Sequence, residues 1–411
     1  MATPATGPKP DQRTDAKTRM NVLLLGVVSF LNDISSEIIQ PILPLFIAQL
    51  GGGSMAVGLI GGVSDGLPSI LKVLSGCWSD RLGRRKPLVV AGYAISAMGK
   101  LFLPFASAWQ HVFLLKTLER SGKGVRSAPR DAMISESTDQ GHRGRGFGLH
   151  RAMDSAGAVV GSMLAYLLWQ GGFGYPSILM LAGILSVAAL LPFYWVKESS
   201  RAPDCCTSSI RLNLSSLSPE LKRFLFIACL FALGNFSYMF FILRAQDHFS
   251  GSMAVAAPLL LYLLFNLVYA LLAMPVGIWS DRVGRKRVLF LGYSLFALTA
   301  VGFAAVSSLW GLIALFAMYG LVYALVDGSE RAYVSDLCPA GLRGSSLGIY
   351  YGAVGVASII SSLVAGALWS VWGAEASFLY GAAAAALAAV GLLVMMKCEV
   401  RPLHLKRKKL K

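Results

Sequence analysis

Charged residues are scarce in this sequence: they make up 14% of its 411 residues, whereas 55% are hydrophobic. A soluble domain carries roughly 25% charged residues, so the scarcity argues against a soluble protein. The apolar residues also stand in long runs, such as 179–196, 259–277 and 378–396. Because runs of roughly 18 or more predominantly apolar residues are typical of membrane-spanning helices, the composition predicts a membrane protein.

Cysteine and histidine are also few, with six cysteines and five histidines. No cysteine stands in a connection that we expect on the outside, which argues against a disulfide framework. The adjacent Cys205 and Cys206 could bind a soft metal, but we interpret them as a chance pair in a cytoplasmic connection. The sequence contains no Walker loop, no Ser/His/Asp arrangement and no metal-ligand spacing, and therefore predicts no enzyme, no cofactor and no metal site.

Acidic residues are outnumbered by basic ones, 21 against 37, which gives a formal net charge of +16. Such an excess can indicate nucleic-acid binding, but here the basic residues stand in short clusters at alternate connections between apolar runs. This positive-inside pattern predicts an inner-membrane protein with an even number of spans, both termini in the cytoplasm and no nucleic-acid partner. The basic clusters are 81–86, 142–145, 222–223, 282–287 and 406–411.

A polar stretch near the middle of the chain separates two sets of six expected spans. The sequence thus predicts an all-α membrane protein of twelve transmembrane helices in two six-helix bundles. The expected parts are a cytoplasmic tail at 1–20, a first bundle at 21–196, a cytoplasmic linker at 197–221, a second bundle at 222–397 and a basic cytoplasmic tail at 398–411. The expected spans are 21–50, 55–79, 87–106, 110–136, 146–170, 174–196, 222–248, 253–279, 288–306, 311–336, 344–369 and 374–397.

The two bundles repeat each other at a constant offset. The segment 76–86 reads GCWSDRLGRRK, and the segment 277–287 reads GIWSDRVGRKR. Further along, ISE at 134–136 is echoed by VSD at 334–336. Repeated halves in a membrane protein indicate a transporter that works by alternating access, with its site near the midplane between the halves.

At these residues the chain resembles the major facilitator superfamily, whose signature is Gly-x-x-x-Asp-Arg-x-Gly-Arg-Arg between the second and third helices. The resemblance covers 21–396 and implies two six-helix bundles related by a pseudo-two-fold axis, which carry a small solute between them. The first signature comprises Gly76, Asp80, Arg81, Gly83, Arg84 and Arg85, and the second comprises Gly277, Asp281, Arg282, Gly284, Arg285 and Lys286.

The resemblance also implies a latch that closes the cytoplasmic side in the outward-open state. We expect Asp80, Arg84 and Glu136 to form it, with a weaker second latch of Asp281, Arg285 and Asp336. A second feature of the family argues against simple multidrug export. Drug–proton antiporters carry a Gly-Pro-rich motif in the fifth helix, whereas Gly157-Ala-Val-Val-Gly161 here lacks the proline.

Ionisable residues inside the expected spans are costly and usually functional. Most of them stand in the first bundle, where Asp33 and Glu37 lie one turn apart on one helix face. We expect proton coupling and the substrate cavity at Asp33, Glu37, Asp65, Lys72, Glu119, Arg120, Lys123, Arg126, Arg130, Arg151 and Asp154.

Two interpretations compete for these charges. In the first, which we favour for Asp33 and Glu37, a carboxylate takes up a proton and releases a basic partner such as Arg120 or Arg126. In the second, which we favour for Arg151–Asp154 and Arg130–Asp131, the charges merely neutralise each other.

The second bundle is expected to contribute a more apolar wall, with Phe236, Tyr238, Tyr262 and Phe265 as aromatic members. The span 311–336 adds Asp327, Glu330 and Arg331 in its cytoplasmic half.

The summed charge of the first bundle's site residues is near neutral when all are ionised, and positive once a carboxylate is protonated. That balance favours an anionic or zwitterionic solute over a lipophilic cation. The sequence therefore predicts a proton-coupled secondary transporter of a small organic solute, acting as a monomer in the bilayer. Export of a drug or toxic compound and uptake of a metal chelate stay open, as does a membrane sensor that binds without transport. The complete gating motifs argue against the sensor.

Overall fold

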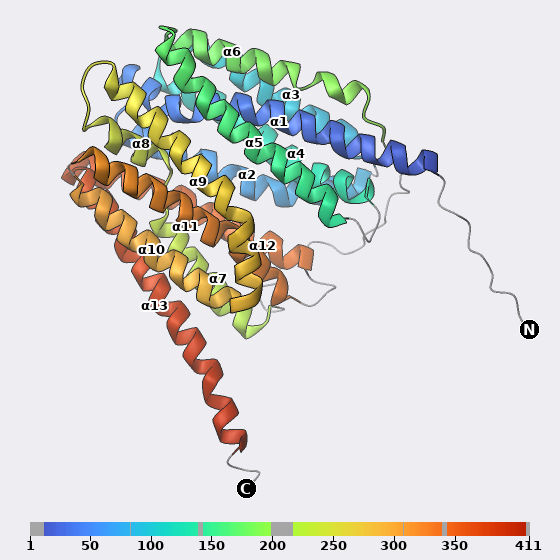
Figure 1. The fold of residues 1–411 in the computed structure, drawn as a ribbon, viewed down its shortest axis with the longest axis vertical. Helices are drawn as coiled ribbons and strands as arrows, with labels where there is room; N and C mark the ends of the chain where they lie inside the picture. Colours follow the sequence, from blue (N-terminus) through green and yellow to red (C-terminus); the bar gives the residue numbers. More distant parts are fainter. Residues whose placement is uncertain are drawn as a thin grey trace, which may run out of the picture.

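The computed structural model describes residues 12–82, 84–138, 143–198, 217–306, 308–338 and 343–407. Within these ranges the chain is helical apart from short connections, and it forms no strand. The long helices fall into two halves, α1–α6 and α7–α13, which are blue to green and yellow-green to red in Figure 1. The halves meet at one end of the molecule and diverge towards the end where both termini lie.

The first half follows the expected spans closely. Eleven helical segments of the described residues are long and apolar enough to cross a membrane. The twelfth, α4, has 28 residues but carries too many charges to meet that criterion. The helices are α1 (Gln12–Gln49), α2 (Ser54–Leu82), α3 (Lys86–Phe102), α4 (Trp109–Glu136), α5 (Arg143–Gln170) and α6 (Tyr175–Ala188), with short 3-10 turns at Leu103–Phe105 and Leu191–Tyr194.

The second half differs from expectation in its first span, which is two helices rather than one. It comprises α7 (Pro219–Gly234), α8 (Met239–Gln246), α9 (Met253–Val283), α10 (Arg285–Ala305), α11 (Leu309–Asp336), α12 (Arg343–Trp372) and α13 (Ala374–Arg407). The span expected at 222–248 is therefore present but interrupted at its centre. Gly234 and Asn235 are both poor helix formers, and Asn235 leaves helical geometry at φ −90° and ψ 74°.

The break between α7 and α8 lies inside the protein. The backbone N–H of Ser237 donates to Ser362 Oγ of α12 at 3.1 Å. Irregular backbone at membrane depth is tolerated where it is buried in protein or lines a cavity. The break therefore marks a place where the second half has an interior polar surface.

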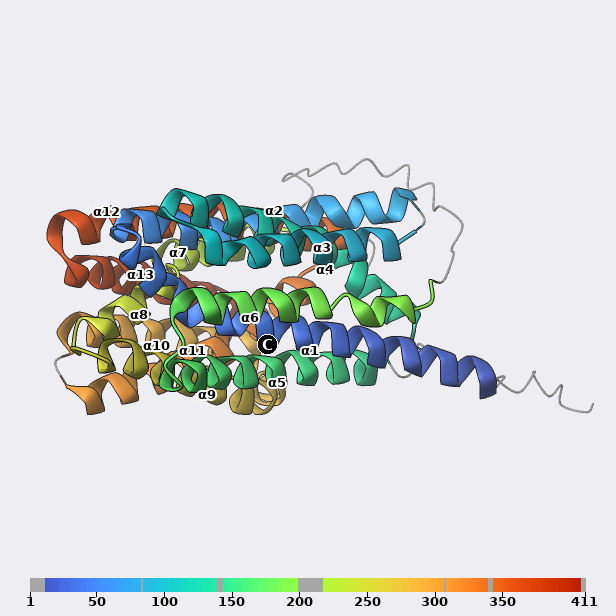
Figure 2. The same cartoon turned by 90° about the horizontal axis from the view of Figure 1, so that it is seen from above.

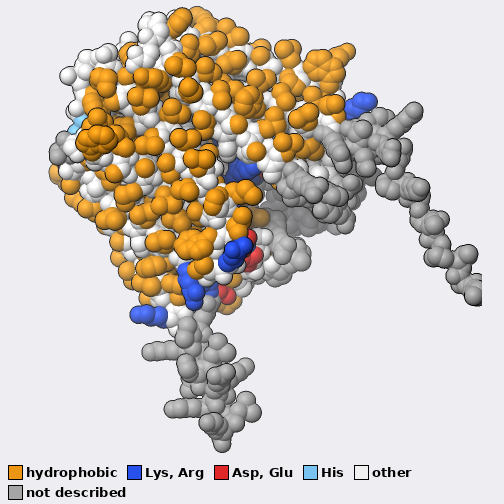
Figure 3. All heavy atoms as spheres, viewed as in Figure 1, with side chains coloured by type: hydrophobic (Ala, Val, Ile, Leu, Met, Phe, Trp, Pro, Cys, Tyr) orange, Lys and Arg blue, Asp and Glu red, His pale blue; other side chains and the backbone are white. Residues whose placement is uncertain are grey.

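The outer surface is apolar. Hydrophobic side chains cover the face drawn in Figure 3, and its few charged side chains gather towards the end where the halves diverge. Large apolar side chains such as Phe226, Leu298 and Leu387 are more than half exposed. A soluble protein rarely exposes so much contiguous apolar surface, whereas a bilayer solvates it. The chain is a multi-pass membrane protein.

The two ends of the bundle differ in their connections. The end that carries Arg84, Arg85, Arg282 and Arg285 is called the basic end below, and the opposite one the far end. Both α1 and α13 have their chain terminus at the basic end. At the far end, tight turns use glycines at positive φ, among them Gly51 at 78°.

Two seams join the halves, α2 with α12 and α5 with α9, and they lie on opposite edges of the molecule in Figure 2. Along the first seam small residues let the backbones approach closely. A Cβ on Gly66 would lie 2.2 Å from the carbonyl oxygen of Gly355, and one on Gly58 would lie 2.4 Å from that of Ser362. Small residues at such interfaces are how helices associate in membranes without a hydrophobic driving force.

Two glycines of α12 give a matched test of this seam. A Cβ on Gly355 would meet the Gly66 oxygen at 2.8 Å and Ser69 Cβ at 3.1 Å, whereas one on Gly352 meets nothing within 4 Å. We expect Gly355→Ala to destabilise the protein by about 1–3 kcal/mol, because the added methyl group would overpack the seam. Gly352→Ala should leave stability unchanged or raise it by up to about 1 kcal/mol, the helix preference of alanine. Thermal unfolding in detergent measures both, and equal melting temperatures would contradict this description of the seam.

Candidate functional site

The expected site residues lie on α1, α2, α4 and α5, and several of them face a cleft between the halves. Asp65 on α2 is exposed although it lies inside a span, and Arg151 on α5 is 58% exposed. Asp65 is electrostatically close to Arg120 and Lys123 of α4 and to Ser237 of the other half. Its exposure is therefore to the interior of the bundle, so the space between the halves admits water.

Glu37 is held by the opposite half of the molecule. The Tyr262 hydroxyl donates to Glu37 Oε2 at 2.9 Å, and Asn266 Nδ2 donates to the same oxygen at 3.2 Å. Gln40 of α1 donates to the other oxygen, and Asn266 also donates to Ser162 Oγ at 2.8 Å. In the described part of the chain Glu37 forms no ion pair. A carboxylate of the first half thus joins α9 of the second half through neutral donors alone.

Two glycines of α5 bring that helix against the carboxylates of α1. A Cβ on Gly161 would lie 2.6 Å from the Ile34 carbonyl oxygen and 2.8 Å from Glu37 Cβ. A Cβ on Gly157 would lie 3.2 Å from Asp33 Cβ. The glycines of the motif that lacks the family's proline therefore set the position of Asp33 and Glu37.

The basic side chains of α4 form a stripe along the helix, and they are divided between a buried network and the cleft. The members of this basic stripe are Arg120, Lys123, Arg126 and Arg130. Glu119 is 1% exposed and pairs with Lys116 and, at 3.5 Å, with Arg120. Arg126 turns away from the cleft, donates to Ser96 Oγ and lies 4.2 Å from the centre of the Tyr93 ring. Neither Arg120 nor Arg126 forms an ion pair with Asp33 or Glu37 in the described residues, because both are engaged elsewhere.

Arg120 and Lys123 are the members of the stripe nearest the centre. Arg120 is electrostatically close to Tyr238, Asp65 and Glu37, and Lys123 to Asp33. They bring positive charge to the wall of the cleft that faces the second half.

Lys100 and Lys116 were not among the expected site residues. Lys100 is 1% exposed and donates to Asn32 Oδ1 at 3.1 Å and to Ser36 Oγ at 2.8 Å. A lysine in the otherwise apolar span 87–106 was the signal that could have found it.

The other expected pairs are resolved differently. Arg130 and Asp131 pair at 3.0 Å, as expected. Arg151 does not pair with Asp154. It crosses to the second half and lies 3.7 Å from Asp327, while Asp154 lies 3.4 Å from His150 Nδ1. The expected pairing of Arg151 with Asp154 is thus replaced by a link between α5 and α11.

Lys72 completes the charges on the basic side of the cleft. It lies 3.6 Å from Asp131 and 5.0 Å from the centre of the Tyr351 ring on α12.

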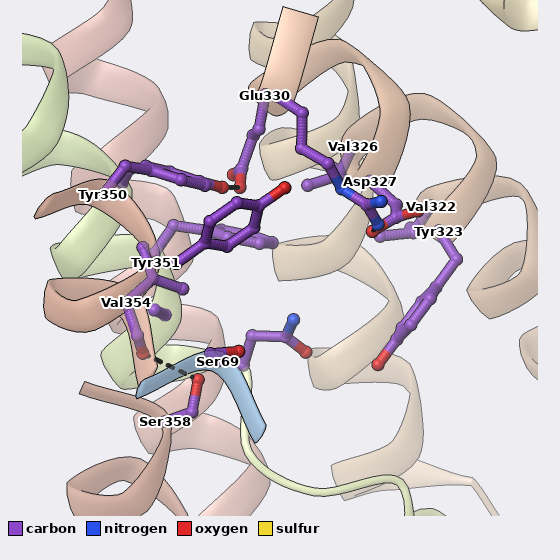
Figure 4. A pocket seen from close by; sticks show the side chains of 15 residues that line it. Ser69, Val322, Tyr323, Val326, Asp327, Glu330, Tyr350, Tyr351, Val354 and Ser358 are labelled. Carbon is purple, nitrogen blue, oxygen red and sulfur yellow. Dashed lines mark hydrogen bonds and ion pairs between the residues drawn. The ribbon is translucent and has the colours of Figure 1, made fainter. Parts of the chain in front are cut away.

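A cavity of about 220 Å³ opens in the second half, where sequence reasoning placed mainly an apolar wall. It is lined by α7, α11 and α12 together with Ser69 of α2, and Figure 4 shows its polar side chains. Glu330 on its wall accepts hydrogen bonds from Tyr293 at 2.5 Å and from Tyr350. A buried glutamate in the apolar span 311–336 was the available signal.

The expected aromatic wall is present in part. Tyr238 and Tyr262 lie 5.6 Å apart between ring centres, and Tyr262 and Phe265 also lie 5.6 Å apart. Phe236 packs instead in the core of the second half, 5.4 Å from Phe378.

The latch residues form contacts within each half. Arg85, rather than the expected Arg84, pairs with Glu136 at 2.7 Å, which joins the start of α3 to the end of α4. Arg285 pairs with Asp281 at 2.9 Å and also with Asp336. The three members of the second latch thus come together.

The other signature residues are placed as follows. Gly284 turns the chain at φ 102°, and Arg84 and Arg282 are exposed. Gly76 lies in α2, where an added Cβ would make only an ordinary contact of 3.5 Å with Ala128 Cβ. Gly83 and the side chains of Asp80 and Arg81 lie outside the described residues, as does the Cys205–Cys206 pair. Within the described ranges no group of His, Cys, Asp and Glu side chains is placed to hold a metal ion.

Comparison with known proteins identifies the family of this fold. The family model described as Major Facilitator Superfamily matches residues 25–265 and 224–411. The chain belongs to the major facilitator superfamily. An uncharacterized MFS-type transporter of Methanocaldococcus jannaschii is 44% identical over 389 residues, which cover 94% of this chain and 96% of that protein.

More distant members of the superfamily have names that mention a solute. The multidrug resistance protein MdtH of Aeromonas hydrophila is 26% identical over 340 residues, covering 80% of this chain and 83% of that one. The crystal structure of the nucleoside transporter NupG has a TM-score of 0.75 at 16% identity, covering 92% of this chain and 99% of the other. The crystal structure of a POT family transporter in complex with a thioalcohol-conjugated peptide has a TM-score of 0.75 at 12% identity. The match covers 92% of this chain and 96% of that one. The superfamily membership makes this chain a membrane transporter rather than an enzyme, and the structural likenesses establish its fold.

The buried network on α4 allows a test against a surface pair. Glu119→Gln leaves Lys116 and Arg120 buried without their counter-charge, and breaking such a pair typically costs ~3–5 kcal/mol. Glu375→Gln is the control, because the 3.0 Å pair of Glu375 with Arg244 is 54% exposed on the glutamate side and is expected to contribute at most ~1 kcal/mol. We expect a much larger fall in the melting temperature for Glu119→Gln. Equal falls would contradict the buried network.

Proposed function

We propose that this transporter is a proton-coupled secondary transporter of a small organic solute, and that Glu37 carries the proton. The observation that supports this assignment most directly is the contact of the partly buried Glu37 carboxylate with Tyr262 and Asn266 across the two halves. A group that titrates at a seam between two moving halves links its protonation to their separation.

Proton uptake by Glu37 would weaken the far end of the molecule. Hydrogen bonds to a charged acceptor contribute about 1.5–3 kcal/mol each, roughly twice those between neutral groups. Because a protonated carboxyl group still accepts neutral hydrogen bonds of about 0.5–1.5 kcal/mol, protonation weakens the two contacts from α9 by about 2–3 kcal/mol in total. That is roughly half of the ~5.5 kcal/mol that moves a two-state equilibrium from 1:99 to 99:1. The charged groups that face Glu37 are Asp33 on its own helix and Arg120 and Lys123 on α4.

Alternating access supplies the movement. In the present state the far end is closed: Tyr238 donates to the Gln40 carbonyl at 3.3 Å and Ser54 to that of Gly366 at 3.1 Å, both across the halves. Towards the basic end Arg151 is 58% exposed, and Lys72 and Asp327 are 30% and 31% exposed. We propose that the halves rock about the cleft, with both termini in the cytoplasm of an inner membrane and the protein acting as a monomer.

The latches are proposed to act at the basic end. The contacts of Arg85 with Glu136 and of Arg285 with Asp281 and Asp336 would hold the connections that meet when that end closes, with Asp80, Arg81 and Arg84 of the first signature in the same role. The two halves would correspond to 21–196 and 222–397, joined by a cytoplasmic linker at 197–221.

The charges around the cleft support a zwitterionic or anionic solute. The first half presents Lys72, Arg120, Lys123 and Arg151, and the second half presents the glutamate of its cavity. A second candidate function is export of a toxic compound, which the likeness to the MdtH proteins supports.

The proton site can be tested without knowing the solute. Spin labels at Phe173 and Trp310, which are exposed at the far end in opposite halves, report its opening in a cysteine-free background. We expect the label distance to lengthen in acidic buffer, because protonated Glu37 releases α9. Glu37→Gln should give the long distance at every pH. The pH response of Asp33→Asn is the control: if Asp33→Asn abolishes the response and Glu37→Gln preserves it, Glu37 is not the proton carrier.

The solute class can be tested by thermal shift. Matched triplets of an amino acid, its decarboxylated amine and its deaminated acid differ only in charge. We expect the zwitterion or the anion to stabilise the protein most, by about 2.7 kcal/mol at one hundred times its Kd. Stabilisation by the amines alone would favour the toxic-compound exporter instead.

A further inference from the structure

The cavity in the second half is small and polar on one side. Its volume is about 220 Å³. Glu330 and Asn235 line its walls. Figure 4 shows Glu330 near the rings of Tyr350 and Tyr351, with Tyr323 on the same cavity. Nothing in the proposed proton movement at Glu37 uses this space.

Glu330 has unused capacity to accept hydrogen bonds. It is 7% exposed, and its two oxygens accept from the hydroxyls of Tyr293 and Tyr350. An ionised carboxylate offers about four lone-pair positions, so two are left. No basic side chain forms an ion pair with it in the described part of the chain, since the adjacent Arg331 pairs with Asp327.

Asn235 supplies a second free acceptor in the same cavity. Its Oδ1 is buried and has no donor among the described residues. The break between α7 and α8 places it there, because the chain leaves the helix at this residue. A buried amide oxygen without a donor costs about 1–3 kcal/mol unless a ligand or water supplies one.

The charges and aromatic rings of the cavity wall also favour a cation. Of the charged lining residues, Asp327 and Arg331 neutralise each other, which leaves the negative charge of Glu330. Phe231 and the three tyrosines present aromatic rings, and aromatic faces attract cations. Arg151 approaches this wall at Asp327, but it is 58% exposed and therefore largely screened by water.

We infer that this cavity, called the acceptor pocket below, binds the ammonium group of the transported solute. The inference rests on the proposed transport function and narrows its substrate class to small amines that also carry an anionic group. The ammonium donates to Glu330 and to Asn235 Oδ1, and the anionic group faces Lys72 and Arg151 on the other side of the cleft.

Charge-selective modification of an engineered thiol tests the pocket without a known solute. Ser358 and Ser69 both line it, from α12 and α2. Ser358→Cys or Ser69→Cys is introduced into a cysteine-free chain. Its reaction rates with aminoethyl, sulfonatoethyl and methyl methanethiosulfonate are measured and divided by the rates for a free thiol in solution. These probes carry an ammonium, a sulfonate and no charge.

We expect the ammonium reagent to react at least about tenfold faster than the sulfonate, because an unpaired charge in a site of low dielectric acts strongly at short range. Glu330→Gln should bring the ratio close to one, and Asn235→Asp, which adds a charge at the same size, should raise it. Glu375→Gln, at an exposed pair on the far end, should leave it unchanged.

Three results would overturn the inference: a ratio at or below one in the parent, a preference that survives Glu330→Gln, or thiols at both positions that react with none of the three reagents. If Glu330→Gln fails to fold, an unchanged ratio in Asn235→Asp is decisive against it. None of these readouts involves proton-driven movement, so a failure here leaves the label distances of the Glu37 variants to decide the proposed function separately.

Discussion

A charged side chain inside a bilayer has to face either a partner or water, and this requirement organises the whole interior of the protein. The most charged helix, α4, packs between α2 and α3 rather than against lipid. There Glu119 neutralises Lys116 and Arg120 in a dry network, while Asp65 and Arg151 keep contact with water in the cleft. Pairing inside the bundle and exposure in the cleft are thus two ways to avoid placing an uncompensated charge in the lipid.

The contact between the halves combines two kinds of surface with different roles. Along α2 and α12, glycines such as Gly66 and Gly355 allow backbones to touch without large interlocking side chains. On α1 and α9 the contact is polar and centred on Glu37. The titratable contact at Glu37 is the one on which the proposed coupling of protonation to movement depends.

Much of the architecture could be read from the sequence because a bilayer makes hydrophobic run length a direct measure of a span. The repeated signature located the paired connections, and the spacing of Asp281, Arg285 and Asp336 matched a cluster that the structure contains. The partners of the buried charges could not be read in the same way. Arg151 meets Asp327 from the other half instead of Asp154 one turn away, because helix rotation and packing decide which faces meet.

Composition, run length and repeated motifs were enough to predict a membrane protein of twelve spans that resembles the major facilitator superfamily, since these are local or periodic properties. Which polar groups lie together could be seen only in the folded protein. The donors that reach Glu37 from α9 are more than two hundred positions away, and the cavity beside Glu330 depends on three helices meeting. Such proximity is set by packing, and no single segment of the chain records it.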